Sequence, residues 1–210
     1  LSVLLLLACL SASSAATRTW DGGGGDNLAS TAENWTDDTA PVTGDNVVLG
    51  ATSTKAMTWD DASPSNIASW TQLSGYSGTV TFETHFPGQG APTNITISGD
   101  CVISNGTWTH PANSGSNTEV DRLAVSIGGT LVVGSSASID VSDVGFAAGR
   151  GPGYGGAGNT GGAYGGGAEG NHATLFGKTY GLVNTPTRLG SGGGSWRGGG
   201  LVRLDVAGAT

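Results

Sequence analysis

A long glycine-rich stretch constrains this chain more than any other feature of its sequence. Residues 145–170 contain thirteen glycines, and residues 190–200 contain seven. Glycine has no side chain to bury and loses the most backbone entropy on ordering, so such a stretch cannot build an ordinary hydrophobic core. Strand-like sequence lies on both sides of it. We therefore predict that residues 145–200 form an excursion from a β-rich framework built by the rest of the chain.

The first sixteen residues have the character of a secretory signal peptide. An apolar run over Leu1–Leu10 is followed by small residues that end at Ser14-Ala15-Ala16, which fits a small-x-small cleavage site. The run is shorter than the roughly 20 residues that a membrane-spanning helix needs. A second interpretation stays open, because Leu6-Leu-Ala-Cys9 is similar to the lipobox of bacterial lipoproteins, in which Cys9 would be acylated. Both interpretations predict a protein that is secreted or held at a cell surface.

The composition of the full sequence is that of an exported all-β protein. Only 11% of the residues are charged and 37% are hydrophobic, and Thr, Ser, Asn and Gly separate the apolar residues. No stretch keeps apolar residues at helical spacing, so we expect almost no helix. Cys101 is the one cysteine left after the leader, which excludes an intrachain disulfide. Its apolar neighbours indicate a small buried side chain.

The net charge of −8 is unevenly distributed along the chain. Residues 1–100 carry ten acidic residues against Arg18 and Lys55, whereas residues 144–210 carry five basic residues against Glu169 and Asp205. An acidic N-terminal part disfavours nucleic acid as a partner. We therefore predict no nucleic-acid partner and no transmembrane segment within these 210 residues. Extracellular glycans or other surface components are the partners that such a chain could meet.

Short apolar strands separated by small residues set the organisation of the chain. Strand starts recur at Leu123, Leu131 and Ile139, and the connectors are too short for helices. A β-solenoid and a β-sandwich both produce such a pattern. Small residues at the corners favour the solenoid. Beyond the glycine-rich stretch, residues 204–207 (Leu-Asp-Val-Ala) echo residues 139–142 (Ile-Asp-Val-Ser), which indicates that the strand pattern stops near 142 and resumes near 201.

These observations divide the chain into five parts. They are a signal peptide over 1–16, an N-terminal capping and first-coil module over 17–84, solenoid coils over 85–144, the glycine-rich excursion over 145–200 and a resumed solenoid strand over 201–210. The sequence stops part-way into what looks like another Gly-x-Thr corner. A solenoid needs several coils and a capped end for stability. We therefore expect these residues to be the N-terminal part of a longer chain.

Two segments resemble a known kind of protein. The opening Trp20-Asp-Gly-Gly-Gly-Gly-Asp-Asn27, followed by Asn34-Trp35 and Pro41-x-x-Gly-Asp45, looks like the start of large bacterial β-helical surface proteins of the autotransporter-like and adhesin-like kind. The stretch that begins Gly149-Arg-Gly-Pro-Gly-Tyr is similar to the glycine-rich insertions of those proteins. The resemblance implies a right-handed parallel β-helix displayed outside the cell. It implies no particular ligand.

Candidate binding residues are few. Gly22–Asn27 partly fits the calcium-binding nonapeptide, with Asn27 in an aspartate position, but the motif occurs once and such sites need tandem copies. We therefore predict no cofactor and keep calcium as a minor alternative. Trp20 and Trp35 lie beside Asp and Asn, the setting in which exposed tryptophans stack on sugar rings. Their other interpretation is that they pack the cap over the first coil, which buries large flat side chains.

The sequence carries no catalytic signature. His85, His110 and His172 are scattered, and no metalloprotease, nucleophile-elbow or phosphate-loop motif occurs. β-Helical polysaccharide lyases and glycosidases need clustered carboxylates or a basic residue on one face, and the acidic residues near the strand ends are typical of corners. Two functions stay open. One is a structural or adhesive surface protein, and the other is the N-terminal part of a carbohydrate-active β-helical enzyme.

Overall fold

The computed structural model describes residues 15–113, 115–154, 161–165 and 179–208. Within this part of the chain the protein is all-β, and its one helical element is the 3-10 turn η1 (Ala32–Asn34). The prediction of almost no helix is therefore confirmed for the described residues. None of these residues forms a helix that is long and apolar enough to cross a bilayer. The predicted signal peptide and Cys9 lie outside them, apart from Ala15 and Ala16.

Parallel strands form the first of two sheets. One stack runs in the order β1 (Thr17–Trp20), β2 (Asn46–Leu49), β5 (Ser69–Gln72), the first half of β9 (Cys101–Thr109) and the first half of β11 (Leu131–Ile139). Two further strands, β3 (Met57–Trp59) and β6 (Thr79–Phe82), stack on the second half of β9. Inward side chains alternate with outward ones along these strands, as a sheet with one buried face requires.

The second sheet is also parallel, with one short exception. Its order is β4 (Asn66–Ile67), β8 (Ile95–Ile97), β10 (Asp121–Ile127) and β12 (Val202–Val206). The two-residue strand β7 (Thr84–His85) pairs antiparallel with the start of β10. Every other pair of strands in the described residues is parallel, so the alternative of an antiparallel β-sandwich is wrong.

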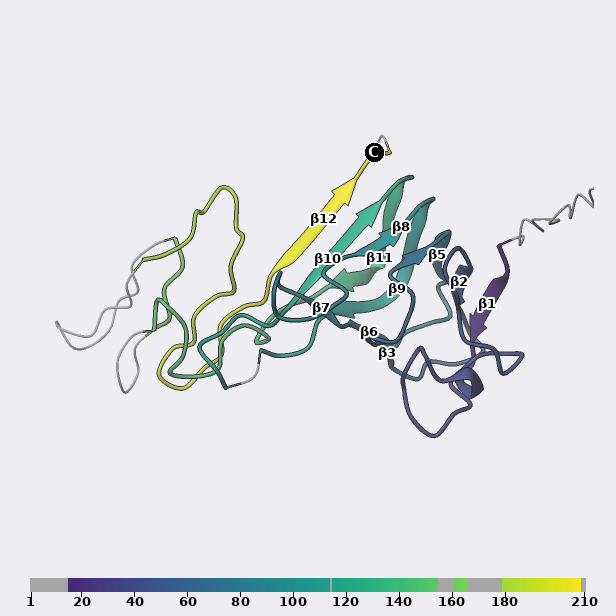
Figure 1. Cartoon of the computed structure of the whole chain (residues 1–210), viewed down its shortest axis with the longest axis horizontal. Coiled ribbons are helices and arrows are strands. Elements are labelled where there is room, and N and C mark those ends of the chain that lie inside the picture. Colours follow the sequence, from purple (N-terminus) through teal and green to yellow (C-terminus); the bar gives the residue numbers. More distant parts are fainter. Residues whose placement is uncertain (1–14, 114, 155–160, 166–178, 209–210) are drawn as a thin grey trace, which may run out of the picture.

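The chain returns to each sheet after a similar length of sequence. Ile95 pairs with Val125 and Cys101 pairs with Leu131, in each case thirty residues further on. Figure 1 shows the result, a stack of turns in which strands of successive turns lie side by side. The eight-residue recurrence from Leu123 to Ile139 does not mark strands of successive solenoid turns. β10 and β11 are consecutive sides of one turn, and β11 extends as one strand from Leu131 to Ile139.

The glycine-rich stretch lies in a detour between two stacked strands. Val125 in β10 pairs with Leu204 in β12, which is 79 residues later. The sequence echo of residues 139–142 in residues 204–207 is thus not a stacking relation, because β12 lies on β10 and not on β11. In Figure 1 the detour projects as a group of loops at the end of the molecule opposite β1.

Aromatic side chains fill the space between the sheets. Trp70 is fully buried, and its ring centroid lies 5.4 Å from those of Trp59 and Phe82 and 5.5 Å from that of Trp108. The buried Gln72 side chain accepts a hydrogen bond from the indole nitrogen of Trp108 at 3.0 Å and from that of Trp70 at 3.3 Å. Large rings therefore supply much of the buried area, and their polar atoms have partners.

Candidate functional site

The two tryptophans proposed for sugar stacking do not present their rings to solvent. Trp20 is 0% exposed and Trp35 is 1% exposed. Their rings pack edge to face with centroids 5.4 Å apart, and their indole nitrogens donate to the carbonyls of Lys55 and Ala29. Residues 34–36 also cover the outer edge of β1, where the Thr36 amide donates to the Thr19 carbonyl. Neither ring is open to a sugar in this structure, and their burial agrees with the other interpretation, in which both rings pack over the first turn.

In the partial calcium motif, Gly22–Asn27, backbone oxygens accept hydrogen bonds from the Lys55 side chain. The Lys55 ammonium donates to the carbonyls of Gly22 at 3.0 Å and Gly24 at 2.7 Å and to the side-chain oxygen of Asn34 at 3.3 Å. The Asp26 carboxylate accepts bonds from the Leu28 amide and the Asn34 amide group. These oxygens are the kind that would ligate a calcium ion. Because Lys55 already uses three of them, the loop is held by a lysine.

Replacing Lys55 by methionine is expected to loosen this loop. Methionine keeps the apolar stem but removes a charged donor with three acceptors, so the free energy of unfolding should fall by about 1–3 kcal/mol. Urea unfolding would measure the loss. Thr52→Met, at an exposed neighbouring position, is the control and should change stability little. Unchanged stability in Lys55→Met, or a rise in the melting temperature of the natural chain on adding Ca²⁺, would contradict the assignment.

Backbone contacts between glycines hold the described part of the detour together. We call residues 145–154, 161–165 and 179–200 the glycine-rich lobe. The Gly145 amide donates to the Gly198 carbonyl at 2.7 Å, the Gly198 amide to the Phe146 carbonyl at 2.9 Å and the Gly190 amide to the Gly199 carbonyl at 2.9 Å. Segments far apart in sequence thus bond directly through their main chains. A Cβ atom would lie 2.1 Å from a backbone oxygen at Gly145 and 1.9 Å from one at Gly198, so these two positions need glycine.

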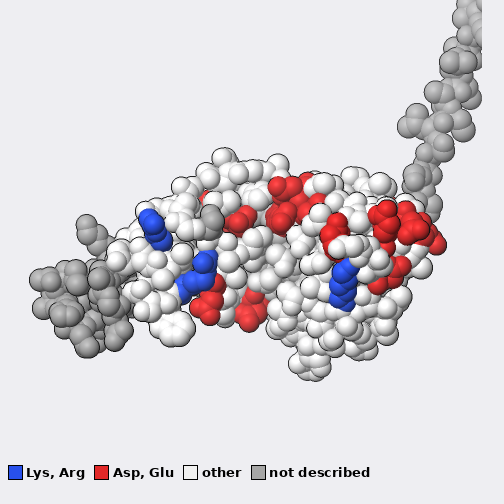
Figure 2. Space-filling view, turned by 90° about the horizontal axis from the view of Figure 1, so that it is seen from below, with Lys and Arg blue, Asp and Glu red and all other residues white. Residues whose placement is uncertain are grey.

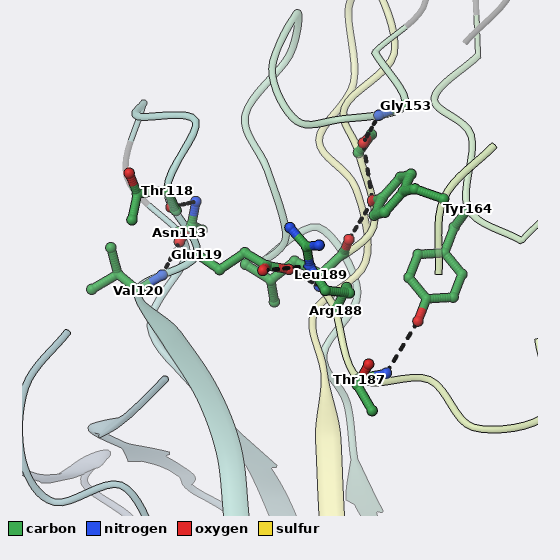
Figure 3. Close-up of polar contacts among 11 residues, drawn as sticks. Asn113, Thr118, Glu119, Val120, Gly153, Tyr164, Thr187, Arg188 and Leu189 are labelled. Carbon is green, nitrogen blue, oxygen red and sulfur yellow. Dashed lines mark hydrogen bonds and ion pairs between the residues drawn. The ribbon is translucent and has the colours of Figure 1, made fainter. Parts of the chain in front are cut away.

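A small cluster and a polar junction fix the lobe to the sheets. Phe146, Leu189 and Leu201 form a separate buried cluster. Beside it, the Glu119 carboxylate accepts the Arg188 Nε–H at 2.6 Å and the Leu189 amide at 2.8 Å, as Figure 3 shows. One carboxylate therefore bonds both a side chain and the backbone of the lobe, from a position in the loop before β10.

A chain of hydroxyl groups continues from this junction into the lobe. The Tyr180 hydroxyl donates to the Leu189 carbonyl and accepts from the Ser191 hydroxyl at 3.0 Å. Ser191 in turn accepts the Gly153 amide at 2.8 Å, and dashed lines in Figure 3 mark this run of bonds between Gly153 and Leu189. Burial raises the pKa of Tyr180 above its ordinary value, since desolvation outweighs the bond from Ser191. The phenol is therefore a neutral structural group across the ordinary pH range.

An exposed aromatic side chain stands on this fixed lobe. Trp196 is 77% exposed, and it borders a hollow of about 340 Å³ whose other walls include Tyr164, Ser191 and Arg197. An adjoining hollow of about 360 Å³ shares Tyr164 and adds Pro186 and Arg188. Pockets for small ligands are of this size or larger and combine apolar walls with a few polar groups. We call Trp196, Tyr164, Ser191 and Arg197 with the adjoining glycines the Trp196 surface.

The position of Arg197 is set by the framework. Its guanidinium donates to the carbonyl of Asn113, which lies in the loop between β9 and β10, and to that of Gly145 at 3.1 Å. Trp196 is therefore next to a residue that is hydrogen-bonded to two other segments of the chain. A larger hollow of about 550 Å³ lies at the edge of the second sheet beside β12, but no aromatic residue lines it. The Trp196 surface is the better candidate for a binding site.

Sequence reasoning missed Trp196, although a signal for it existed. Its neighbours are Ser195, Arg197 and glycines, none of which can cover an indole ring. Trp20 and Trp35 were favoured by their Asp and Asn neighbours, but those polar residues build the loop that buries them. A tryptophan in a segment without apolar neighbours is the better indication of an exposed ring.

Known proteins give no assignment for this site. No protein-family model, no curated protein and no solved structure matches this chain.

Proposed function

We propose that this protein is a secreted or cell-surface protein of structural or adhesive function, built on a right-handed parallel β-helix, that contacts extracellular glycans through the Trp196 surface. The observation that carries the proposal is the indole ring of Trp196, 77% exposed beside a hollow on a lobe that hydrogen bonds fix to the sheets. An exposed ring on a rigid support loses little conformational entropy when a flat apolar ligand face packs on it. Sugar rings offer such faces.

The polar groups around Trp196 suit a hydroxyl-rich ligand. Arg197, Ser191 and several glycines line the same hollow, and the five N–H donors of the Arg197 guanidinium are more than its bonds to Asn113 and Gly145 use. Figure 2 shows most acidic side chains over the N-terminal part and the middle of the face in view, with a basic side chain among them and further basic side chains nearer the lobe. A glycan with acidic groups would therefore meet less repulsion at the lobe than over the rest of that face.

The experiment is glycan binding by the natural chain and by Trp196→Ala. We expect the natural chain to bind a subset of glycans on an array, and we expect Trp196→Ala to weaken that binding by about tenfold or more, the effect of one aromatic stacking contact with its buried area. Leu182→Ala is the matched control, because Leu182 is exposed on the same lobe outside both hollows. Absence of glycan binding by the natural chain, or binding by Trp196→Ala as strong as that of the natural chain, would contradict the proposal.

A carbohydrate-active enzyme is the second candidate function. It is favoured by one observation, the convergence of Asp61, Glu83 and Asp121 near His85. None of the four residues lines any of the hollows described above, however, and the described residues contain no group of His, Cys, Asp and Glu able to hold a metal ion. Asp140 follows β11 of the first sheet, whereas Asp205 lies in β12 of the second. Release of reducing or unsaturated sugars from a polysaccharide panel would favour the enzyme.

A further inference from the structure

His85 joins three segments of the chain that are far apart in sequence. It lies in β7, and its ring is between Asp61, which follows β3, and Asp121, which begins β10. The Nε2 atom is 2.8 Å from a carboxylate oxygen of Asp61, and the Nδ1 atom is 2.8 Å from a carboxylate oxygen of Asp121. The His85 and Asp121 side chains are 12% and 13% exposed, whereas that of Asp61 is 57% exposed.

Other charged groups surround this triad from each packed segment. Glu83 accepts the Asp61 amide at 3.2 Å, and the buried Asp60 carboxylate accepts the Ser30 amide and the Ser63 hydroxyl. On β10, Arg122 lies over the Phe86 ring at 5.2 Å and donates to the Thr93 carbonyl. The charged groups near His85 are therefore four carboxylates and one guanidinium.

The protonation state of His85 decides how many of these contacts it can satisfy. A charged imidazole carries N–H on both ring nitrogens, so it can donate from Nε2 to Asp61 and form an ion pair with Asp121 at Nδ1. A neutral imidazole has one N–H, and its other nitrogen is an acceptor that cannot bond a carboxylate. Loss of the proton would leave one carboxylate facing a lone pair, among several other negative charges.

Hydrogen bonds next to His85 attach the following segment, residues 86–94, to the rest of the chain. The His85 amide donates to the Pro92 carbonyl at 2.9 Å, and the Phe86 amide donates to the Val120 carbonyl at 2.8 Å. Next to them, the Thr84 hydroxyl oxygen accepts the Ala124 amide at 3.1 Å. The bond of Phe86, with that from Arg122 to the Thr93 carbonyl, holds residues 86–94 against the start of β10, and the bond of Thr84 fixes β7 beside it.

We propose that His85 is a pH-sensitive latch, which holds residues 86–94 against β10 while its imidazole is charged and weakens that attachment when the proton leaves. The proposal is independent of glycan binding.

The electrostatics of the cluster support this direction. Desolvation lowers the pKa of His85, but the hydrogen bond and charge of Asp61, with those of Asp121, outweigh it and leave the pKa above its ordinary value. A raised pKa in the closed state means that the latch is complete below the ordinary histidine pKa, about 6.5, and is lost as pH rises through the closed-state value. Desolvation also raises the pKa of Glu83 and of Asp121, so their ionisation disfavours the closed state in the same direction.

Amide hydrogen exchange tests the latch in the natural chain. Between about pH 5.5 and 8.5, and after correction for the intrinsic rate, the amides of His85, Phe86 and Ala124 should lose about tenfold or more of their protection, since the neutral ring gives up a contact with a carboxylate. The amides of Ile95 and Ile97, in the neighbouring strand β8, should change little. A histidine titration followed by nuclear magnetic resonance should place the pKa of His85 above that of a histidine in an unfolded peptide.

Two variants separate a latch from general pH sensitivity. His85→Gln cannot be charged and should show low protection that no longer depends on pH. Asp61→Asn removes only the exposed partner, and it should lower the pKa of His85 and move the loss of protection to lower pH. Asp143→Asn, at an exposed corner, is the control and should behave as the natural chain. Protection that is constant with pH in the natural chain, or that changes equally in His85→Gln and Asp61→Asn, would overturn the proposal.

Discussion

Trp108→Ala is expected to lower the free energy of unfolding by about 3–5 kcal/mol, the range for removing a large buried aromatic side chain. Trp108 is fully buried, and its ring centroid lies 4.7 Å from that of Phe82 and 5.5 Å from that of Trp70. Its removal opens a cavity between the sheets, because neighbours anchored in separate strands cannot all move inward. It also takes one donor from Gln72, a buried side chain that links two indoles.

Chemical unfolding followed by circular dichroism would measure this loss. Trp196→Ala is the matched control, since it removes the same side chain from an exposed position and should change stability by less than about 0.5 kcal/mol. Trp108→Phe should fall between the two, because it keeps an aromatic ring but loses the N–H that bonds Gln72. Equal stability of the two alanine variants would mean that the aromatic cluster is not the main support of the fold.

The strands themselves could be predicted because their signal is local. In Thr79–Phe82 the threonines alternate with Val80 and Phe82, and the structure buries the two apolar residues and leaves the threonines partly exposed. Short corners of small residues exclude helices between such strands. An all-β chain follows from these local patterns without any knowledge of which strands pair.

The pairing could not be predicted, because it depends on contacts between residues far apart in sequence. The intervals between paired parallel strands vary from 23 residues between Asn46 and Ser69 to 31 between Trp70 and Cys101, and the glycine-rich detour extends one of them to 79. No sequence repeat marks them. The echo between residues 139–142 and 204–207 was misleading, because apolar residues alternating with Asp or Ser are found at many strand ends and do not identify a neighbour.

The surroundings of Trp196 and the His85 latch could not be predicted, for related reasons. Asp61, His85 and Asp121 come from three turns, and nothing in the sequence around each of them points to the other two. Trp196 is next to Arg197, whose bonds to Asn113 and Gly145 fix it to the framework. The sequence identifies the glycine-rich stretch as unusual. Only the structure shows that its main-chain segments pack directly against one another.

Gly198→Ala is expected to disrupt the glycine-rich lobe, in contrast to the same change at the next residue. A Cβ atom on Gly198 would lie 1.9 Å from the carbonyl oxygen of Gly190, far inside contact distance, whereas a Cβ on Gly199 would meet nothing within 4 Å. The obstacle at Gly198 is a backbone atom, which cannot turn away as a side chain can. Moving Gly198 away from Gly190 would also strain the hydrogen bond from the Gly198 amide to the Phe146 carbonyl.

The cost at Gly198 should be about 1–3 kcal/mol, as for other overpacked sites, and it should be concentrated in the lobe. Limited proteolysis should cut Gly198→Ala within the lobe faster than the natural chain, while the sheets stay resistant. Gly199→Ala is the matched control and should be cut at the natural rate. Because the Trp196 surface depends on the same packing, Gly198→Ala should also weaken glycan binding, even though Trp196 is intact. If both glycine variants resist cleavage equally, the lobe is not held by the close backbone contacts described here, and its glycines would need another explanation.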